Sequence, residues 1–404
     1  MKRIYLDHAA ATPVDPRVLK AMAPFWSVEY GNPSAIHKEG VVARKAVEES
    51  RRNIGEMLGV HPDEIVFTGS ATESCNLALF GAVSLWKKRH PKRTPHVIVS
   101  AIEHDAVLMA ARTLEMGGVR LTTLPVNTDG VVSPSALKGA ITEDTVLVSV
   151  MYANNEIGVV QPIREIAKVI RKWKKEHRGL SRDAKQEGES RYPLFHTDAT
   201  QAVNYCDAHV PRLGVDMLTC NAAKIYGPKG IGLLAVSRDV SLYPVIVGGG
   251  QERGLRAGTE NVPLIIGFAQ ALSITRKIQE KEGARLVEIR DNTIANLTRE
   301  IPAIIINGTM KERLPNNIHF SLPETDHEYL AIALDARGVA VATKSACNER
   351  DAETSHVLLA LDGGAGTRPY HGLRITMGRG TAKKDMHMFA KTLKEVLKTM
   401  IAYG

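Results

Sequence analysis

The stretch Glu64-Ile65-Val66-Phe67-Thr68-Gly69-Ser70-Ala71-Thr72 runs from a short apolar segment into a turn of small and polar residues, after which a helical period begins. An apolar run of this length predicts a strand that is covered on both faces of a sheet. Small residues at its end allow backbone N–H groups and the Thr72 hydroxyl to approach an anion at the start of the next helix. Taken alone, the same turn is equally typical of an ordinary helix N-cap.

The same alternation of strand and helix recurs along much of the chain. Upstream, one face of a predicted helix carries Ala43, Ala46, Val47, Ile54, Met57 and Leu58. Further strands are predicted at 96–100, 120–126, 145–152, 194–197, 217–220 and 231–236. This order favours an α/β fold with an open, largely parallel sheet and helices on both sides. After about Val262, patterned segments at 303–306, 317–321, 329–337, 339–343 and 373–377, followed by a final helix, predict a smaller α+β unit.

The composition is that of an ordinary globular protein. The chain has 404 residues, of which 44% are hydrophobic and 24% charged, and no apolar run approaches the ~20 residues that span a bilayer. Its start passes directly into patterned sequence, so we expect no signal or transit peptide, no membrane association and a cytoplasmic enzyme. The formal net charge of +8 is compatible with acidic partners such as tRNA, but we expect it to be mostly solvated surface and expect no direct nucleic-acid binding. The one compositional break, 171–191, is rich in charged residues and predicts an exposed loop, with a basic docking surface as the alternative.

The four cysteines are Cys75, Cys206, Cys220 and Cys347. They form no CxxC pair, and no His/Cys cluster has the spacing of metal ligands, so no metal site is expected. We interpret the first three as reduced, mostly buried thiols. Cys347 differs because its neighbours, Lys344-Ser345-Ala346 and Asn348-Glu349-Arg350-Asp351, are largely polar and charged.

Several predicted strands end in residues that carry chemistry, and ligands of open α/β sheets bind at such carboxyl ends. Asp198, in His196-Thr197-Asp198-Ala199-Thr200-Gln201, is either a helix cap or a buried carboxylate with a cationic partner. Lys224 precedes the turn Ile225-Tyr226-Gly227-Pro228-Lys229-Gly230. A partly desolvated lysine can form a Schiff base, although local sequence alone favours solvent-exposed side chains for both Lys224 and Lys229.

Together these segments carry a resemblance. Gly31-Asn32-Pro33-Ser34, Asn154-Asn155-Glu156-Ile157-Gly158, the Lys224–Gly230 segment, Arg253-Gly254-Leu255-Arg256-Ala257-Gly258-Thr259 and the Ser345-Ala346-Cys347 loop occur in one order. In that order the chain resembles, nearly end to end, the class V aminotransferase-like proteins and, within them, the cysteine desulfurases of the NifS and IscS type. The resemblance implies the fold type I of pyridoxal-phosphate enzymes. It also implies a large domain at 14–262 with a mostly parallel seven-stranded sheet, and a small domain formed by 1–13 and 263–404.

The resemblance also implies roles for particular residues around pyridoxal 5′-phosphate. Lys224 would hold the cofactor covalently and move protons at the substrate α-carbon, and His104 would stack on the ring as an acid or base. Cys347 would be the nucleophile that receives sulfur from L-cysteine as a persulfide. The other implied contacts are Ala71, Thr72 and Asn221 with the phosphate, Asp198 with the ring nitrogen, Gln201 with the phenolic oxygen, Asn155, Arg374 and Asn32 with the substrate, and Thr259 with the cofactor of a neighbouring subunit. A homodimer and a sulfur-acceptor protein, either an iron–sulfur scaffold or a tRNA-thiolation enzyme, follow from these roles.

The chain departs from the family pattern at the segment before the lysine. Asn221-Ala222-Ala223-Lys224 stands where the family has Ser-Gly-His-Lys, so the phosphate loses an imidazole partner at Ala223. Gln251 stands where a histidine is usual, and Gly69-Ser70 reverses the common order. The chain also stops at Gly404 without the C-terminal extension of scaffold-binding relatives, which argues against docking by that route. Besides a cysteine desulfurase, the sequence leaves open a selenocysteine lyase and a cofactor-poor homologue that mainly binds sulfur-transfer partners.

Overall fold

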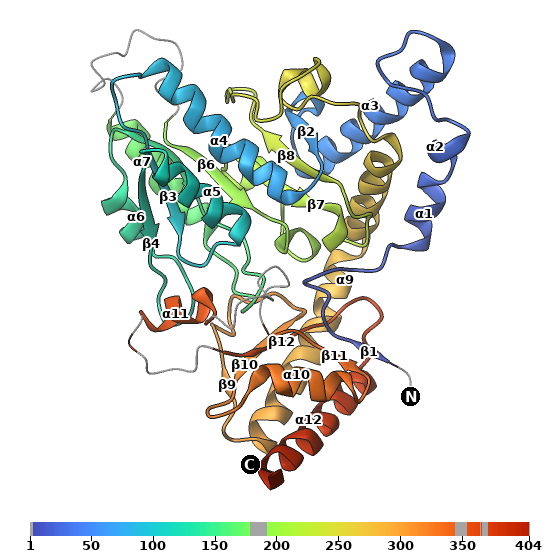
Figure 1. Cartoon of the computed structure of the whole chain (residues 1–404), viewed down its shortest axis with the longest axis vertical. Helices are drawn as coiled ribbons and strands as arrows, with labels where there is room; N and C mark the ends of the chain where they lie inside the picture. Colours follow the sequence, from blue (N-terminus) through green and yellow to red (C-terminus); the bar gives the residue numbers. More distant parts are fainter. Residues whose placement is uncertain (1–2, 178–191, 344–353, 364, 366–370, 404) are drawn as a thin grey trace.

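The computed structural model describes residues 3–177, 192–343, 354–363, 365 and 371–403, which form a large domain and a small domain joined by one long helix (Figure 1). The large domain is built on a seven-stranded sheet of order β2-β8-β7-β6-β5-β3-β4. Only β8 runs antiparallel to its neighbours β2 and β7, so the predicted mostly parallel sheet is confirmed. Its strands are β2 (Ile65–Thr68), β3 (His96–Ser100), β4 (Arg120–Leu124), β5 (Thr145–Ser149), β6 (Leu194–Asp198), β7 (Met217–Asn221) and β8 (Gly232–Val236).

Helices cover both faces of this sheet, which explains why β5 and β6 are buried at every position. Alternate residues of β2 point to opposite faces: Ile65 and Phe67 pack in one core cluster and Val66 in the other. Full burial of each such side chain stabilises the fold by about 1.5–3 kcal/mol. The helices are α1 (Pro16–Met22), α2 (Pro24–Ser27), α3 (Lys38–Leu58), α4 (Ala71–Arg89), α5 (Asp105–Met116), α6 (Pro134–Ala140), α7 (Ile163–Glu176) and α8 (Val210–Leu213). The clusters place α3, α6, α7 and α8 on one face and α4 and α5 on the other.

The small domain contains a three-stranded antiparallel sheet of order β12-β10-β9 and a parallel pair of β1 with β11. The N-terminal strand belongs to this unit because Ile4 and Leu6 lie in its core cluster. Its elements are β1 (Ile4–Tyr5), β9 (Ile305–Ile306), β10 (Asn317–Ser321), α10 (His327–Asp335), β11 (Val339–Ala340), β12 (Leu373–Thr376) and α12 (Lys383–Tyr403). Helix α11 (His356–Asp362) packs instead against loops of the large domain, in a cluster with Ile102, Met151, Ile157 and Val159.

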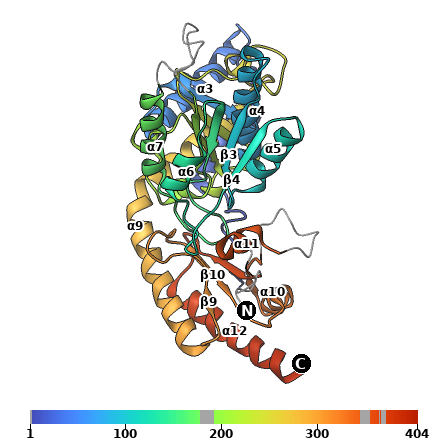
Figure 2. The same cartoon turned by 90° about the vertical axis from the view of Figure 1, so that its left-hand side faces the viewer.

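Helix α9 (Val262–Glu300) connects the two domains and runs along both of them (Figure 2). Its first half, from Val262 to Ile274, packs in the core of the large domain, whereas Leu286 and Leu297 pack in the small-domain core. The predicted boundary after residue 262 therefore coincides with the start of a helix that both domains share.

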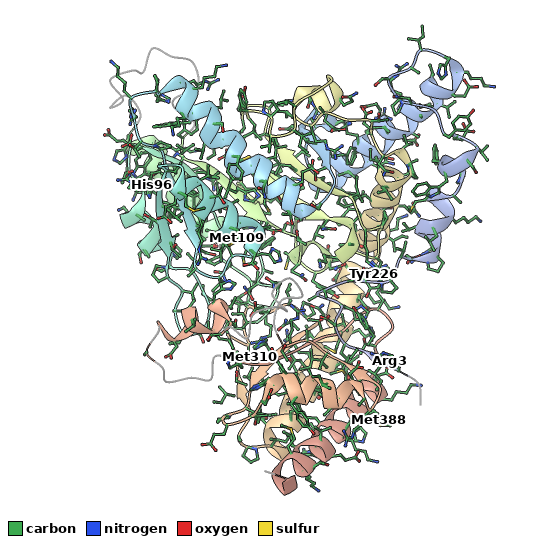
Figure 3. All side chains as sticks on the ribbon, in the orientation of Figure 1. Arg3, His96, Met109, Tyr226, Met310 and Met388 are labelled. Atoms are coloured by element: carbon green, nitrogen blue, oxygen red, sulfur yellow. The ribbon has the colours of Figure 1, made fainter. Side chains whose placement is uncertain are left out.

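The junction between the domains is also closed by Tyr226, which lies between them in Figure 3. Its hydroxyl accepts a hydrogen bond from the backbone N–H of Arg379 at 2.7 Å, and the Arg379 guanidinium lies 3.9 Å from the centre of its ring. A stacked cation of this kind is typically worth about 0.5–2 kcal/mol.

Two sequence predictions differ from the structure in detail. Helix α7 continues through Trp173 to Glu176, so the exposed loop predicted from 174 begins later. Its partly buried Trp173 ring packs on the core and stacks on His177, which extends the helix, and residues 178–191 lie outside the described part of the chain. Several strands are shorter than predicted because their last residues turn into the loops that carry polar groups.

No described helix is long and apolar enough to cross a membrane.

Candidate active site

A cavity of about 170 Å³ lies where the parallel strands of the large sheet end. Loops after β2, β3, β5, β6 and β7 reach it, as expected for the carboxyl edge of an open α/β sheet. Predicted residues that line it are Ala71, Thr72, His104, Asn155, Asp198, Gln201, Asn221, Lys224 and Arg374. The structure thus brings together side chains that are spread over three hundred residues of sequence.

The start of α4 forms one end of the cavity and can bind an anion. Ser70 is the N-cap, and its hydroxyl accepts a hydrogen bond from the Glu73 N–H at 3.1 Å. In a capped helix the first two N–H groups, here those of Ala71 and Thr72, are the donors that the helix itself does not use. These amides and the Thr72 hydroxyl therefore face the cavity with the positive end of the helix dipole behind them.

Asp198, Thr200 and Gln201, which lie at the end of β6 and just after it, form another part of the cavity lining. One Asp198 oxygen, Oδ1, accepts a hydrogen bond from the Thr200 N–H at 2.9 Å, and the carboxylate is 6% exposed. Thr200 lines the cavity, and its buried hydroxyl oxygen has no hydrogen-bond partner in the described part of the chain. Gln201 donates its amide N–H to the Ala9 carbonyl at 3.0 Å.

Lys224 ends a short 3₁₀ turn, Ala222–Lys224, directly after β7. Its amine lines the cavity and donates to the carbonyl oxygen of Ala10. Asn221 starts this turn, and its side-chain oxygen accepts from the Ala223 N–H at 2.9 Å. The oxygen of Asn221 is therefore committed to the turn, and the amide group is what remains to bind a ligand.

Arg374, on β12, contributes a guanidinium from the small domain. It is 2% exposed, pairs with Asp7 through Nη2 at 2.8 Å and donates from Nη1 to the Asn155 carbonyl at 3.2 Å. Its Nε is buried and has no acceptor among the residues that the structure describes. A carboxylate in the cavity would satisfy this atom, which is the arrangement that the fork of an arginine is suited to.

His104 and Glu103 lie at the wall after β3. His104 caps α5 by accepting the Ala106 N–H at its Nδ1 (3.1 Å), so a neutral ring carries its proton on Nε2. The fully buried Glu103 accepts from Ser100 Oγ at 2.5 Å and from the Met151 N–H at 2.7 Å. Burial raises the pKa of Glu103 to about 8, so this carboxyl is largely protonated at neutral pH.

Two predicted residues that the structure describes, Asn32 and Thr259, do not line this cavity. Asn32 is exposed, and its side-chain oxygen accepts from the Ser34 N–H at 2.9 Å. Thr259 is exposed as well and is not part of the cavity lining, as a role toward another subunit would require. Cys347 and its neighbours at 344–353 lie outside the described residues.

Sequence reasoning missed the N-terminal segment, which lines the cavity through Ala9 and Ala10 and holds Arg374 through Asp7. The run of three alanines after Asp7 and His8 is the pattern that could have indicated a close approach to a ligand. It also missed the contact of Cys75 with Asp198, in which the thiol sulfur lies 3.9 Å from Asp198 Oδ2.

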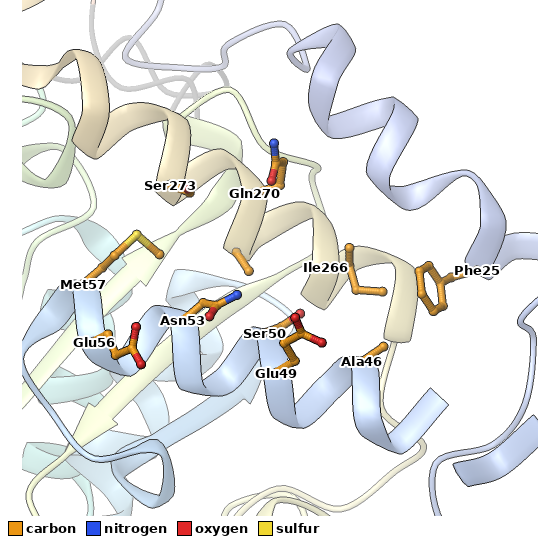
Figure 4. Close-up of a pocket in the computed structure, with 11 residues that line it drawn as sticks. Phe25, Ala46, Glu49, Ser50, Asn53, Glu56, Met57, Ile266, Gln270 and Ser273 are labelled. Carbon is orange, nitrogen blue, oxygen red and sulfur yellow. The ribbon is translucent and has the colours of Figure 1, made fainter. Parts of the chain in front are cut away.

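A larger cavity of about 480 Å³ lies between α3 and α9 (Figure 4). Its lining includes Glu49, Asn53, Glu56 and Gln270, but none of the residues predicted to carry chemistry. Among the described residues, no group of His, Cys, Asp and Glu side chains could hold a metal ion.

The donors of the smaller cavity fit pyridoxal 5′-phosphate. A primary amine, a buried carboxylate and a helix N-terminus face one space, as an aldehyde, a ring nitrogen and a phosphate require. The unpartnered Thr200 hydroxyl and Arg374 Nε leave polar capacity for the cofactor and a carboxylate substrate. Ala223 is the point of poor fit because its side chain offers nothing to a phosphate.

Comparison with known proteins identifies the family. The family model for class-V aminotransferases matches residues 4–389. The chain is 40% identical to a cysteine desulfurase IscS of Dictyoglomus turgidum, over 99% of this chain and 96% of that protein. It is 39% identical to cysteine desulfurase IscS 1 of Archaeoglobus fulgidus, over 98% of this chain and 97% of that one. Among solved structures, a NifS-like protein superposes with a TM-score of 0.86 at 32% identity, covering 98% and 100% of the two chains. A structure of SspA in complex with cysteine gives a TM-score of 0.76 at 32% identity, covering 93% and 98%.

Proposed function

Because this chain belongs to the class-V aminotransferase family, and within it to the cysteine desulfurases of the IscS type, we propose that it holds pyridoxal 5′-phosphate at Lys224 and passes the sulfur of L-cysteine to Cys347. One observation carries the proposal. The Lys224 amine, the Asp198 carboxylate and the unpartnered Nε of Arg374 belong to residues that line the same cavity.

When bound, pyridoxal phosphate supplies an electron sink that weakens bonds around the α-carbon of an amino acid. Lys224 would hold the aldehyde carbon, and the Ala71 and Thr72 amides would hold the phosphate with help from the Asn221 amide. Asp198 would face the ring nitrogen, and Gln201 the phenolic oxygen. These assignments rest on the cavity lining and on the hydrogen bonds that fix each side chain.

The substrate would be oriented by its carboxylate on Arg374, whose position is fixed by Asp7 and by the Asn155 carbonyl. Lys224, once its amine is released, would move the proton of the substrate α-carbon. His104 would exchange a second proton from the opposite wall through Nε2, because its Nδ1 is occupied by the Ala106 N–H.

The sulfur step would belong to Cys347, whose thiolate attacks the substrate sulfur. An S–S bond forms as the Cβ–S bond of the substrate breaks, and the electron pair remains with the carbon, which takes a proton to give alanine. The other cysteines are poorly suited to this role because burial raises their thiol pKa: that of Cys206 to about 12, and those of Cys75 and Cys220 well above the usual value.

The proposal includes a homodimer that delivers sulfur to an iron–sulfur scaffold or a tRNA-thiolation enzyme. A subunit interface is supported by the exposure of Thr259 and by large exposed apolar side chains, Trp26, Val28 and Tyr30 on one segment and Tyr243, Val245 and Val247 on another.

We place the enzyme in the cytoplasm, where free thiols such as Cys75, Cys206 and Cys220 stay reduced.

The test is to purify the protein, load it with cofactor, add cysteine and measure alanine and persulfide. We expect Cys347→Ala to keep the visible absorbance of the bound cofactor and to lose persulfide transfer to an acceptor. Cys206→Ala is the matched control and should transfer sulfur like the parent. Parental transfer by the Cys347 variant would refute the role of that thiol, and absence of cofactor absorbance at saturating cofactor would refute the enzyme proposal. Running the same assay with selenocysteine settles which substrate is preferred.

A further inference from the structure

A row of buried polar side chains leads from the interior of the large sheet to Asp198. Ser149 Oγ lies 2.8 Å from His196 Nδ1, and His196 Nε2 lies 3.0 Å from Thr219 Oγ1. Thr219 Oγ1 lies 3.8 Å from Cys75 Sγ, which in turn lies 3.9 Å from Asp198 Oδ2. Apart from Asp198 at 6%, these residues have no exposed surface. The five side chains come from β5, β6, β7 and α4, so tertiary packing alone brings them together.

We propose that Cys75, supported by Thr219 and His196, is a positioning residue that fixes the carboxylate of Asp198 for the cofactor. The inference rests on the proposed function, in which Asp198 faces the ring nitrogen. It assigns a role to the buried thiol of Cys75, which has none in the proposed function.

The direction of the hydrogen bonds follows from what each group can do. An ionised carboxylate only accepts, so the Cys75 S–H donates to Asp198 Oδ2. The sulfur is then free to accept the Thr219 O–H. Thr219 in turn accepts from His196 Nε2–H, and His196 Nδ1 accepts the Ser149 O–H. Every donor in the row points toward Asp198, and each buried hydroxyl or ring nitrogen finds a partner.

The charge states agree with this order. Burial raises the pKa of Cys75 well above its usual value, so the thiol keeps its proton. Burial also lowers the pKa of His196 to about 4, so the ring is neutral and carries a single proton at working pH. Neutral groups can stay in the interior without a counter-ion, whereas a charged histidine or thiolate would be costly there.

The row matters because, among the described residues, the Asp198 side chain accepts from only two donors. Oδ1 is held by the Thr200 N–H at 2.9 Å, which belongs to the backbone, and Oδ2 is held by Cys75, which is a side chain. Two donors on different oxygens fix the plane of a carboxylate. Cys75 also lies on α4, whose first residues, Ala71 and Thr72, line the phosphate end of the cavity. One helix therefore sets the position of both the phosphate donors and the support of the carboxylate.

The experiment compares cofactor binding in the parent and in Cys75→Ala, Cys75→Ser and Thr219→Val. Two quantities are measured without substrate: the Kd for pyridoxal phosphate added to the cofactor-free protein, and the pH midpoint of the visible absorbance of the bound cofactor. Because a thiol is a weak donor, we expect Cys75→Ala to raise the Kd by a factor of about three to ten and to shift the midpoint. Cys75→Ser keeps a donor and should restore both values, and Thr219→Val should give a smaller change in the same direction. Cys220→Ala is the matched control, because Cys220 is equally buried but packs in the other core cluster of the sheet from Cys75.

The outcomes separate the inference from its premise. Parental values in Cys75→Ala, equal changes in Cys220→Ala, or failure of Cys75→Ser to restore either quantity would overturn the positioning role. Should Cys75→Ala fail to fold, Thr219→Val decides, since it leaves Cys75 in place and removes the hydroxyl that donates to its sulfur and accepts from His196 Nε2. Asp198→Asn tests the premise: if it leaves both quantities unchanged, the proposed role of Asp198 fails. If it changes them while the Cys75 and Thr219 variants do not, only the present inference fails.

Discussion

The substitution Ala223→His tests the least typical feature of the site, the missing imidazole beside Lys224, the lysine proposed to hold the cofactor. The backbone at this position is fixed independently of the side chain. Its N–H donates to Asn221 Oδ1 at 2.9 Å, and its carbonyl accepts from the Thr12 N–H at 3.1 Å and the Thr12 hydroxyl at 2.9 Å. Ala223 is partly exposed, so a ring at this position need not displace core atoms. The substitution therefore changes what faces the cofactor phosphate and leaves the turn in place.

The size of the effect follows from one charge-assisted hydrogen bond. Such a bond contributes about 1.5–3 kcal/mol, and about 1.4 kcal/mol corresponds to a tenfold change in affinity. The side chain is partly open to solvent, which favours the lower half of that range. We therefore expect the Kd for pyridoxal phosphate to fall by about tenfold, and by no more than about a hundredfold.

The assay is a titration of cofactor-free protein, followed by intrinsic fluorescence and by visible absorbance. Ala223→Leu is the matched control because it adds bulk without a donor, and it should leave the Kd unchanged or raise it. An Ala223→His protein that folds like the parent but binds cofactor with parental affinity would show that other groups already saturate the phosphate. The reasoning from Ala223 would then be wrong.

Two further predictions concern residues around the same cavity. Asp7→Asn removes the charged partner of Arg374. We expect the KM for cysteine to rise by about tenfold with little change in kcat, because a misplaced guanidinium weakens carboxylate binding. Steady-state kinetics measures both constants, and a lower kcat at constant KM would contradict the prediction. Glu103 has a folded-state pKa of about 8 against an ordinary value of 4.5, so the native protein binds the extra proton and its stability falls as the pH rises from about 4.5 to about 8. Glu103→Gln should therefore flatten the decline in the free energy of unfolding over this range, measured by urea denaturation at several pH values, and an unchanged slope would show that Glu103 is ionised throughout.

Much of the fold could be predicted from the sequence because the central strands carry their own pattern. The stretches 96–100 and 317–321 match β3 and β10 from end to end. In the first, Val97-Ile98-Val99 is a continuous apolar run, as expected for a strand covered on both faces. In the second, Ile318 and Phe320 alternate with polar residues, which is the period of a strand. Asp198 and His104 could be placed in one site for a related reason. Each follows a parallel strand, and the carboxyl ends of parallel strands meet at one edge of the sheet.

The remainder depends on contacts between distant segments. Nothing local to Cys75 distinguishes it from any buried helical cysteine, and its contact with Asp198, 123 positions away, arises from the packing of α4 on the sheet. The sharing of α9 between two cores is equally invisible, because a helix of 39 residues has the same periodicity whichever domain it packs against.

The N-terminal segment explains how the two domains are kept in register around one cavity. Ile4 and Leu6 are fastened in the small-domain core, and Asp7 holds Arg374 beside them. A few residues later, the carbonyls of Ala9 and Ala10 accept from Gln201 and Lys224 of the large domain. The lysine proposed to hold the cofactor and the arginine proposed to hold the substrate carboxylate thus bind the same short segment of backbone, Lys224 at Ala10 and Arg374 at Asp7. A displacement of the small domain would change the distance between these two groups at once. The alanines between the ties also have a physical reason, because any longer side chain at either position would extend into a cavity of only about 170 Å³.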